Sequence, residues 1–228
     1  ARICYVNKMD RQGANFFSVV DQLREKLDAN PVVLSLPIGA EDSFAGIVDL
    51  IEMKSYIWNE EDKGATFEVY DIPEDMEQDA AEYRTKLIET LAGFDDSLME
   101  KYFEDPDSIT AEELIRIIRN ATINRQINPV LCGSSFKNKG VQKLIDAVVM
   151  YLPSPQDMPA IQGINPKTEK EETRNCDVQA PFSALAFKIA TDPYVGKLTF
   201  IKVYSGELKS GDVVWNANTE KRERVAKI

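Results

Sequence analysis

The sequence predicts an α/β fold that carries an inserted α+β subdomain and is followed by the start of a small antiparallel β-barrel. Two short apolar strands, one near each end of residues 1–152, each lead through a polar loop into an amphipathic helix. A longer, strongly acidic segment lies between these two strand–loop–helix units, which is the pattern of an insertion into a parent α/β domain. After Pro153 the pattern changes to strands alone.

The first of these units lies at the beginning of the chain. Ile3-Cys4-Tyr5-Val6 is an apolar run typical of a buried strand, and it leads into Asn7-Lys8-Met9-Asp10. Apolar residues at helical spacing then predict a helix over about 14–28, and the apolar run 31–38 predicts one further strand. Because the chain starts directly on a strand and has no initiator Met, we expect it to be an internal fragment of a longer protein.

The segment between the two units is mixed in structure and acidic in charge. Apolar and alternating runs predict three short strands, at residues 46–51, 54–58 and 66–70. Helical spacing then predicts three helices, which start near Pro73, Asp95 and the capping-box pattern that begins at Thr110. Residues 41–113 hold 23 acidic and 5 basic side chains, whereas the rest of the chain is mildly basic. This charge suits either a solvated surface or a surface that avoids nucleic acid and contacts a protein.

The second strand–loop–helix unit is followed by a linker and a C-terminal part made of strands. The apolar strand 129–132 leads into Gly133-Ser134-Ser135, and a helix is expected over 141–152. A linker follows over 153–177; it includes a charged loop at 167–174 and four prolines, namely Pro153, Pro155, Pro159 and Pro166. Strands are then expected at residues 182–189, 197–204, 213–215 and near the C-terminus. This run predicts the opening of an antiparallel barrel with unpaired edges.

The composition is that of a globular protein in a reducing compartment. The chain is 43% hydrophobic and 29% charged, with a net charge of −11. No run approaches the roughly 18 apolar residues of a membrane-spanning helix. Cys4, Cys132 and Cys176 fit neither a zinc spacing nor a disulfide framework, so we expect a cytoplasmic location. The absence of His removes the commonest general base and metal ligand.

Asn7-Lys8-Met9-Asp10 matches N-K-x-D, a tetrapeptide found at strand ends in guanine-binding sites. Guanine presents two adjacent N–H donors, and the carboxylate of Asp10 can accept both in a charge-assisted fork. Adenine presents a different edge and would leave that carboxylate partly unpaired. The Asn7 amide can brace a neighbouring loop, and the Lys8 stem can lie along the base with its ammonium in water. The alternative interpretation is a polar turn after a strand.

Gly133-Ser134-Ser135 forms the second candidate site. Small residues between a strand and a helix allow the backbone N–H groups of Ser134 and Ser135 to approach the guanine carbonyl oxygen, although an ordinary capped loop has the same composition. Ligands bind at the carboxyl ends of parallel strands, so this loop and Asn7-Lys8-Met9-Asp10 would meet if their strands were neighbours. The 228 residues contain no G-x-x-x-x-G-K-[ST] phosphate-binding loop.

Six segments resemble the bacterial translation elongation factor G family: residues 7–16, 37–41, 46–50, 132–142, 151–155 and 182–189. The resemblance runs along the whole chain and includes the acidic insertion. It implies that residues 1–152 are the C-terminal part of a P-loop GTPase domain, with an inserted α+β subdomain at about 35–125. It further implies a linker over 153–177 and the N-terminal part of a β-barrel domain over 178–228.

The resemblance also implies a function, because this family hydrolyses GTP to drive translocation of tRNA and mRNA on the ribosome. Carried over to this chain, Asn7, Lys8, Asp10, Ser134 and Ser135 would bind the guanine base of GTP or GDP. The family usually has Ala where Ser135 stands. The inserted subdomain would contact the ribosomal stalk protein, and the barrel would face ribosomal RNA.

The family's phosphate loop, Mg²⁺ ligands and catalytic residues have no counterpart in this sequence. We therefore expect no catalytic residue or metal ligand in the chain, and no GTPase activity from the chain alone. Two other interpretations stay open. The chain could derive from a related ribosomal GTPase of the recycling, release-factor or ribosomal-protection type, or it could act only as a protein-binding module through the inserted subdomain.

Overall fold

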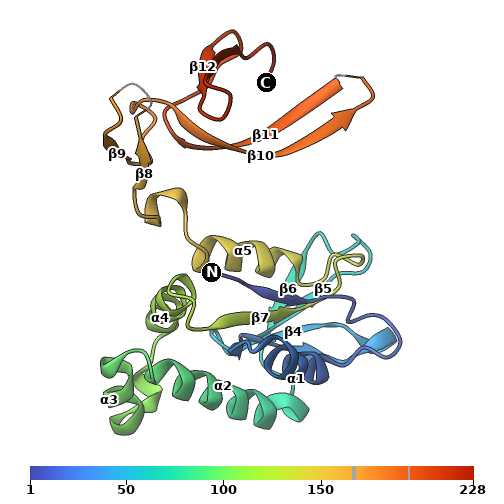
Figure 1. The fold of residues 1–228 in the computed structure, drawn as a ribbon. Helices are drawn as coiled ribbons and strands as arrows, with labels where there is room; N and C mark the ends of the chain where they lie inside the picture. Colours follow the sequence, from blue (N-terminus) through green and yellow to red (C-terminus); the bar gives the residue numbers. More distant parts are fainter. Residues whose placement is uncertain (166–167, 195) are drawn as a thin grey trace. The chain divides into compact units, whose positions relative to one another are not determined.

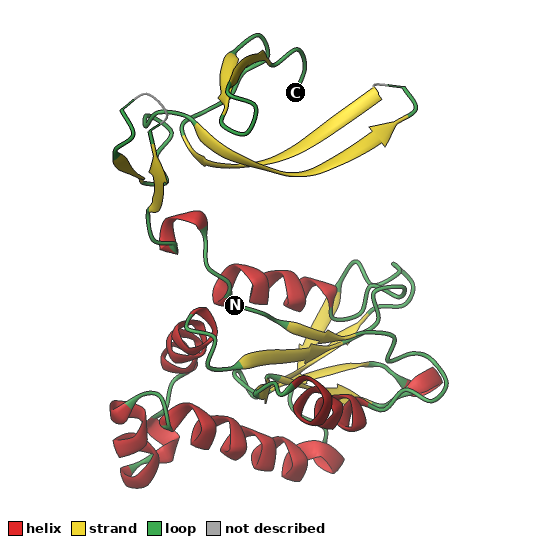
Figure 2. Ribbon diagram, viewed as in Figure 1, coloured by secondary structure: helices red, strands yellow, loops and turns green. Residues whose placement is uncertain are grey.

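The computed structural model describes residues 1–165, 168–194 and 196–228, apart from the side chain of Asp107. Pro166 and Lys167 of the expected linker lie outside the described residues. The chain divides into two compact units, residues 1–152 and 153–228. The first mixes helices and strands, and the second consists mainly of strands (Figures 1 and 2). The predicted α/β class is therefore confirmed.

A three-stranded parallel sheet positions both candidate loops. Its order is β1-β7-β2, formed by β1 (Cys4–Val6), β7 (Asn128–Cys132) and β2 (Pro31–Val33). Helix α1 (Phe16–Leu27) follows β1, and α5 (Val141–Tyr151) follows β7, as the two predicted strand–loop–helix units require. In the register of β1 and β7, Val6 lies opposite Cys132, so Asn7 and Gly133 leave the sheet at the same end.

The apolar run 31–38 forms two strands, so the prediction of a single strand was wrong. After β2 the chain continues as β3 (Ser35–Ile38), which belongs to a different sheet. Leu34 lies where the chain passes from one sheet to the other. Its N–H donates to Val130 O at 2.9 Å, and its carbonyl accepts from Leu50 N at 3.0 Å. Residues 31–36 are buried on both sides of this change and all but Ser35 are apolar, so the pattern gives no sign of the new partner.

The insertion is an antiparallel sheet followed by three helices. The sheet has the order β3-β4-β5-β6, with β4 (Gly46–Asp49), β5 (Lys54–Trp58) and β6 (Phe67–Tyr70). The helices are α2 (Glu77–Ala92), α3 (Asp96–Glu104) and α4 (Ala111–Ile123). The capping box predicted at Thr110 is present, because its hydroxyl accepts from Glu113 N and Glu113 accepts from Thr110 N.

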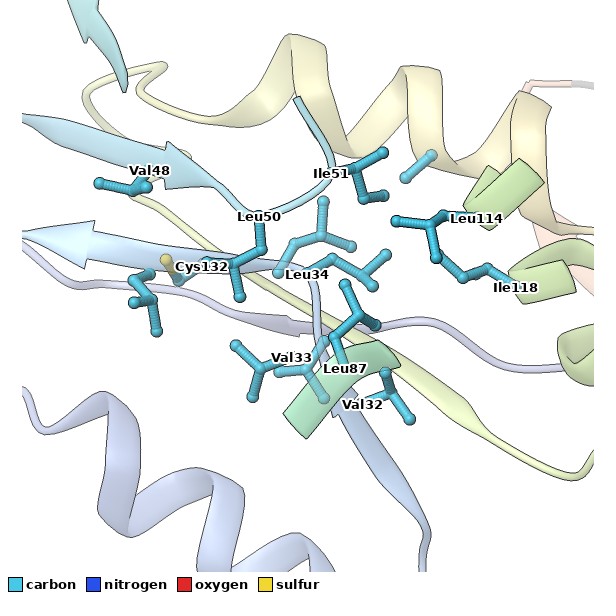
Figure 3. Packing of buried hydrophobic residues seen from close by; sticks show 14 of the residues in the cluster. Val32, Val33, Leu34, Val48, Leu50, Ile51, Leu87, Leu114, Ile118 and Cys132 are labelled. Carbon is cyan, nitrogen blue, oxygen red and sulfur yellow. The ribbon is translucent and has the colours of Figure 1, made fainter. Parts of the chain in front are cut away.

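One hydrophobic core joins the parallel sheet β1-β7-β2, which we call the parent sheet, to the insertion. Val32 and Leu34 of the parent chain belong to the same cluster of buried side chains as Leu50, Leu114 and Ile118 of the insertion (Figure 3). All five side chains are at most 4% exposed. Figure 1 shows α5 and α2 on opposite sides of the strands of this unit. The insertion therefore shares its packing with the sheet that carries the candidate site.

The described residues of the second unit form three antiparallel hairpins. They pair β8 (Ile161–Ile164) with β9 (Glu171–Arg174), β10 (Ser183–Asp192) with β11 (Gly196–Ser205), and β12 (Val213–Asn216) with β13 (Lys221–Arg224). The first hairpin lies within the segment expected as a linker. Alternate apolar residues of β10, such as Leu185, Phe187 and Ile189, are more than half exposed. In the described part of the chain, no helix is long and apolar enough to cross a membrane.

Candidate functional site

The two candidate loops meet at one end of the parallel sheet. Asn7-Lys8-Met9-Asp10 follows β1, and Gly133-Ser134-Ser135 follows the neighbouring strand β7. The backbone continues the pairing past the strands, because Gly133 N donates to Val6 O at 3.0 Å and Met9 N donates to Gly133 O at 3.1 Å. Met9 is 1% exposed and anchors its loop in the core, which leaves the polar residues around it at the surface.

Asn7 links the two loops directly. Its side-chain oxygen Oδ1 accepts a hydrogen bond of 2.9 Å from the backbone N–H of Ser135, and a second of 2.7 Å from Lys8 N. Lys8 has a φ of 65°, a left-handed conformation that costs a non-glycine residue about 1–2 kcal/mol. Both Asn7 and Lys8 are exposed. The bracing role predicted for the Asn7 amide is therefore present.

Asp10 is half-buried and carries a carboxylate ready to accept hydrogen bonds. A hydrogen bond from the Ser134 hydroxyl is the main reason that the pKa of Asp10 lies below its usual value; partial burial opposes this effect, and nearby Lys137 and Arg11 add to it. The Ser134 hydroxyl oxygen also accepts from Lys137 N at 3.3 Å. Asp10 is thus ionised at neutral pH, which is the form that accepts two N–H donors.

The two serines of the second loop occupy different environments. Ser134 is fully buried, and its N–H donates to Lys139 O at 2.9 Å, so this donor is used inside the protein. Ser135 is exposed, and its N–H donates to Asn7. The side chain of Ser134 supports Asp10, whereas Ser135 places its backbone at the surface of the site.

Gly133 and Tyr5 shape the floor of the second loop. A Cβ atom on Gly133 would lie 2.1 Å from the Tyr5 hydroxyl oxygen and 2.3 Å from Lys139 O, so only glycine fits there. The Tyr5 hydroxyl donates to Lys139 O at 3.1 Å. Burial raises the pKa of Tyr5, so its hydroxyl keeps the proton that it donates.

The structure adds residues of the insertion that the sequence motifs did not indicate. Glu41 N donates to Met9 O at 2.8 Å, and Glu41 Oε1 accepts from Gly13 N at 2.7 Å. The ammonium of Lys139 donates to Phe44 O at 2.9 Å. The two contacts of Glu41 join residues 28 and 32 positions apart, and the contact of Lys139 joins residues 95 positions apart, so no local pattern could have indicated them.

The residues at the sheet end fit a purine base with adjacent N–H donors. The site offers one ionised carboxylate on Asp10, an exposed amide on Asn7 and an exposed loop backbone at Ser135. The described residues hold no group of three or more His, Cys, Asp or Glu side chains suited to a metal ion.

Each of the two units matches a known protein family. Residues 1–154 match the elongation factor Tu GTP binding domain, and residues 181–228 match elongation factor G domain 2. Elongation factor G of Amoebophilus asiaticus (strain 5a2) is 56% identical over 227 residues, which cover 100% of this chain and 32% of that protein. The chain thus spans about a third of the length of this curated relative.

A solved crystal structure from Thermus thermophilus matches with a TM-score of 0.72, covering 98% of this chain and 30% of that chain. Its 22% sequence identity shows a likeness of fold alone. The whole-length identity and the two domain matches agree with the resemblance carried by the sequence motifs. The chain belongs to the elongation factor G family.

Proposed function

We propose that the chain is the guanine-recognition part of an elongation factor G, a GTPase that hydrolyses GTP to drive translocation of tRNA and mRNA on the ribosome. The observation that supports this most is the hydrogen bond from Ser135 N to Asn7 Oδ1, which joins the two loops at one sheet end. Family membership supplies the reaction class. On this proposal, residues 1–152 with an insertion at about 35–125 belong to the GTPase domain, and 178–228 to the barrel domain.

The base is recognised by complementary hydrogen bonds. The carboxylate of Asp10 accepts the two adjacent N–H groups of guanine. Asn7 holds the loop of residues 7–10 against the loop of residues 133–135. Ser135 N–H shares its hydrogen with the guanine carbonyl oxygen as a three-centre bond. The Lys8 stem lies along the base plane. Adenine lacks this donor pair, so its binding would leave the carboxylate unpaired at a cost of about 1–3 kcal/mol or more.

GTP supplies the phosphoanhydride bond that the full-length factor hydrolyses with Mg²⁺. This chain contributes base recognition to that reaction, and its 228 residues contain no phosphate-binding loop. We therefore expect the chain alone to hydrolyse no GTP and to bind GDP with a Kd weaker than micromolar. Calorimetric titration of the chain with GDP checks this expectation, and a micromolar Kd would contradict it.

The ribosome is the proposed partner of the full-length factor in the cytoplasm. The acidic insertion, with 23 acidic and 5 basic residues over 41–113, suits contact with the stalk protein because it repels RNA phosphates. The barrel is proposed to face ribosomal RNA. Retention of the chain on immobilised stalk protein tests the first contact. Deleting the C-terminal unit, residues 153–228, should leave that retention unchanged. Loss of retention on this deletion would show that the C-terminal unit, and not the insertion, makes the contact.

The decisive test of base recognition uses the full-length factor that contains this sequence. We expect GDP to bind at least about a hundredfold more tightly than ADP, because two charge-assisted hydrogen bonds distinguish the bases. Fluorescence competition with a labelled guanine nucleotide measures both constants. Equal affinity for the two nucleotides would contradict the proposal.

A further inference from the structure

The insertion contacts the loop of Ser134 and Ser135 through a buried lysine. The Lys139 side chain is 4% exposed, and its ammonium donates to Phe44 O at 2.9 Å and to Glu60 Oε1 at 2.7 Å. Both partners belong to the insertion. A buried ammonium that loses its partners is strongly unfavourable, so these contacts hold Lys139 in one place.

The backbone of Lys139 in turn sets the position of Ser134. Ser134 N donates to Lys139 O at 2.9 Å, and Lys139 N donates to Ser134 O at 3.0 Å, which closes the loop as a short antiparallel bridge. Ser134 then supports Asp10 with its hydroxyl and precedes the exposed Ser135. A displacement of Lys139 would therefore move both guanine-binding loops.

A second set of contacts joins the same two segments. The carbonyl of Gly64, in the turn between β5 and β6, accepts from Asn138 Nδ2 at 2.9 Å and from Gln142 Nε2 at 2.9 Å. Gly64 has a φ of 74°, and a Cβ atom there would lie 2.6 Å from Lys137 O. The close approach shows that residues 59–65 pack tightly on the loop.

We infer that Lys139 is a positioning residue for guanine specificity, through which residues 44 and 59–65 of the insertion hold the Ser134–Ser135 loop in its base-binding conformation. The inference rests on the proposed function for its consequence, since the loop must bind guanine for its position to affect specificity. It assigns the insertion a role in nucleotide recognition that is separate from any contact with a partner protein.

Lys139→Met and Lys143→Met form a matched pair of variants. Lys143 also lies on the second strand–loop–helix unit, is 14% exposed at its side chain, and pairs with Asp49 of the insertion at 3.1 Å. Each substitution removes one largely buried charge that is paired with the insertion. Only Lys139 has its backbone bonded to Ser134, so only Lys139→Met should displace the loop.

Hydrogen exchange of the chain itself tests the positioning. We expect Lys139→Met to raise the exchange rates of the Ser134 and Ser135 amides at least about tenfold, whereas Lys143→Met leaves them unchanged. Equal effects of the two variants would overturn the inference. Glu60→Ala is a milder variant, because Glu60 is 72% exposed at its side chain, and it should raise the same rates about threefold. If Glu60→Ala leaves the exchange rates of Ser134 and Ser135 unchanged, the ion pair between Glu60 and Lys139 does not position the loop, which overturns that part of the inference.

Nucleotide binding by the full-length factor tests the consequence. Lys139→Met should reduce the ratio of GDP to ADP affinity about tenfold, Lys139→Arg should restore part of it, and Lys143→Met should leave it unchanged. An unchanged ratio in Lys139→Met would overturn the inference while leaving the proposed function intact. A wild-type factor without preference for GDP would instead overturn the proposed function, and the exchange measurement would still report on the loop.

Discussion

The side chain of Asn7 accepts a hydrogen bond of 2.9 Å from the backbone N–H of Ser135, a residue 128 positions further along the chain. The whole insertion lies between these two residues in sequence, yet their strands are neighbours in the parallel sheet. The insertion leaves the parent sheet after β2 and returns to it at β7. It therefore adds a subdomain without separating the two loops.

The link between the loops predicts the effect of Asn7→Ala. This change removes the acceptor of an exposed backbone N–H, and the net loss of such a hydrogen bond costs about 0.5–1.5 kcal/mol. GDP affinity of the full-length factor should fall by about 2- to 12-fold, as measured by fluorescence titration. Asn15→Ala serves as the control, since Asn15 also accepts a backbone N–H, from Ser18 at 2.9 Å, but caps α1. A similar loss of affinity in both variants would show that the link has no special role.

The support of Asp10 by Ser134 predicts a shift in titration. Ser134→Ala removes the hydrogen bond that contributes most to lowering the pKa of Asp10, so this pKa should rise toward the usual value of an aspartate. NMR titration of the Asp10 carboxyl carbon measures the change. Ser135→Ala keeps its backbone N–H and should leave the titration unchanged. A pKa of Asp10 that is the same in Ser134→Ala and wild type would contradict this account.

The same interaction predicts how stability depends on pH. The pKa of Asp10 is lower in the folded state than in the unfolded state, so its stabilising contribution is present above about pH 3.9. The contribution is lost as the pH falls through the folded-state pKa. Urea unfolding of wild type and Ser134→Ala should therefore differ less at about pH 2 than at about pH 7, and an equal difference at both values would exclude this linkage.

The shared core predicts that the insertion and the parent sheet lose stability together. Leu114→Ala removes a side chain with 0% exposure and should lower the free energy of unfolding by about 2–5 kcal/mol. Leu27→Ala makes the same change at a side chain that is 69% exposed, and should alter stability by no more than about 0.5 kcal/mol. Urea unfolding, followed by the fluorescence of Trp58 in β5 in a Trp215→Phe background, measures both. Equal effects would contradict the packing shown in Figure 3.

Much of the fold follows from local patterns in the sequence. The helical spacing after Asp10, the capping box at Thr110 and the apolar strand before Gly133 each lie where predicted, because each depends on neighbouring residues. The change of sheet at Leu34 could not be predicted in this way. Both strands are mainly apolar and mostly buried, and β2 pairs with β7 whereas β3 pairs with β4.

The candidate site also has a part that local motifs predict and a part that depends on contacts between distant residues. Asn7 and Asp10 could be identified because N-K-x-D is a local motif, and the loop of Ser135 because neighbouring strands would bring it to the same base; the structure shows that the strands are neighbours. The role of Lys139 depends on contacts with residues 79 and 95 positions away, which no periodicity or spacing encodes. A lysine after a strand is ordinarily a solvated side chain, and only the packed structure shows this one buried.

Base selection by Asp10 is the central claim, and the full-length factor carrying Asp10→Asn tests it most directly. The amide offers one acceptor and one donor, which matches xanthine, whose ring has an N–H beside a carbonyl where guanine carries its amino group. We expect GDP affinity to fall at least about a hundredfold and xanthosine diphosphate to become the preferred ligand in competition titrations. A variant that still prefers GDP by the wild-type ratio would contradict the claim that Asp10 recognises the base.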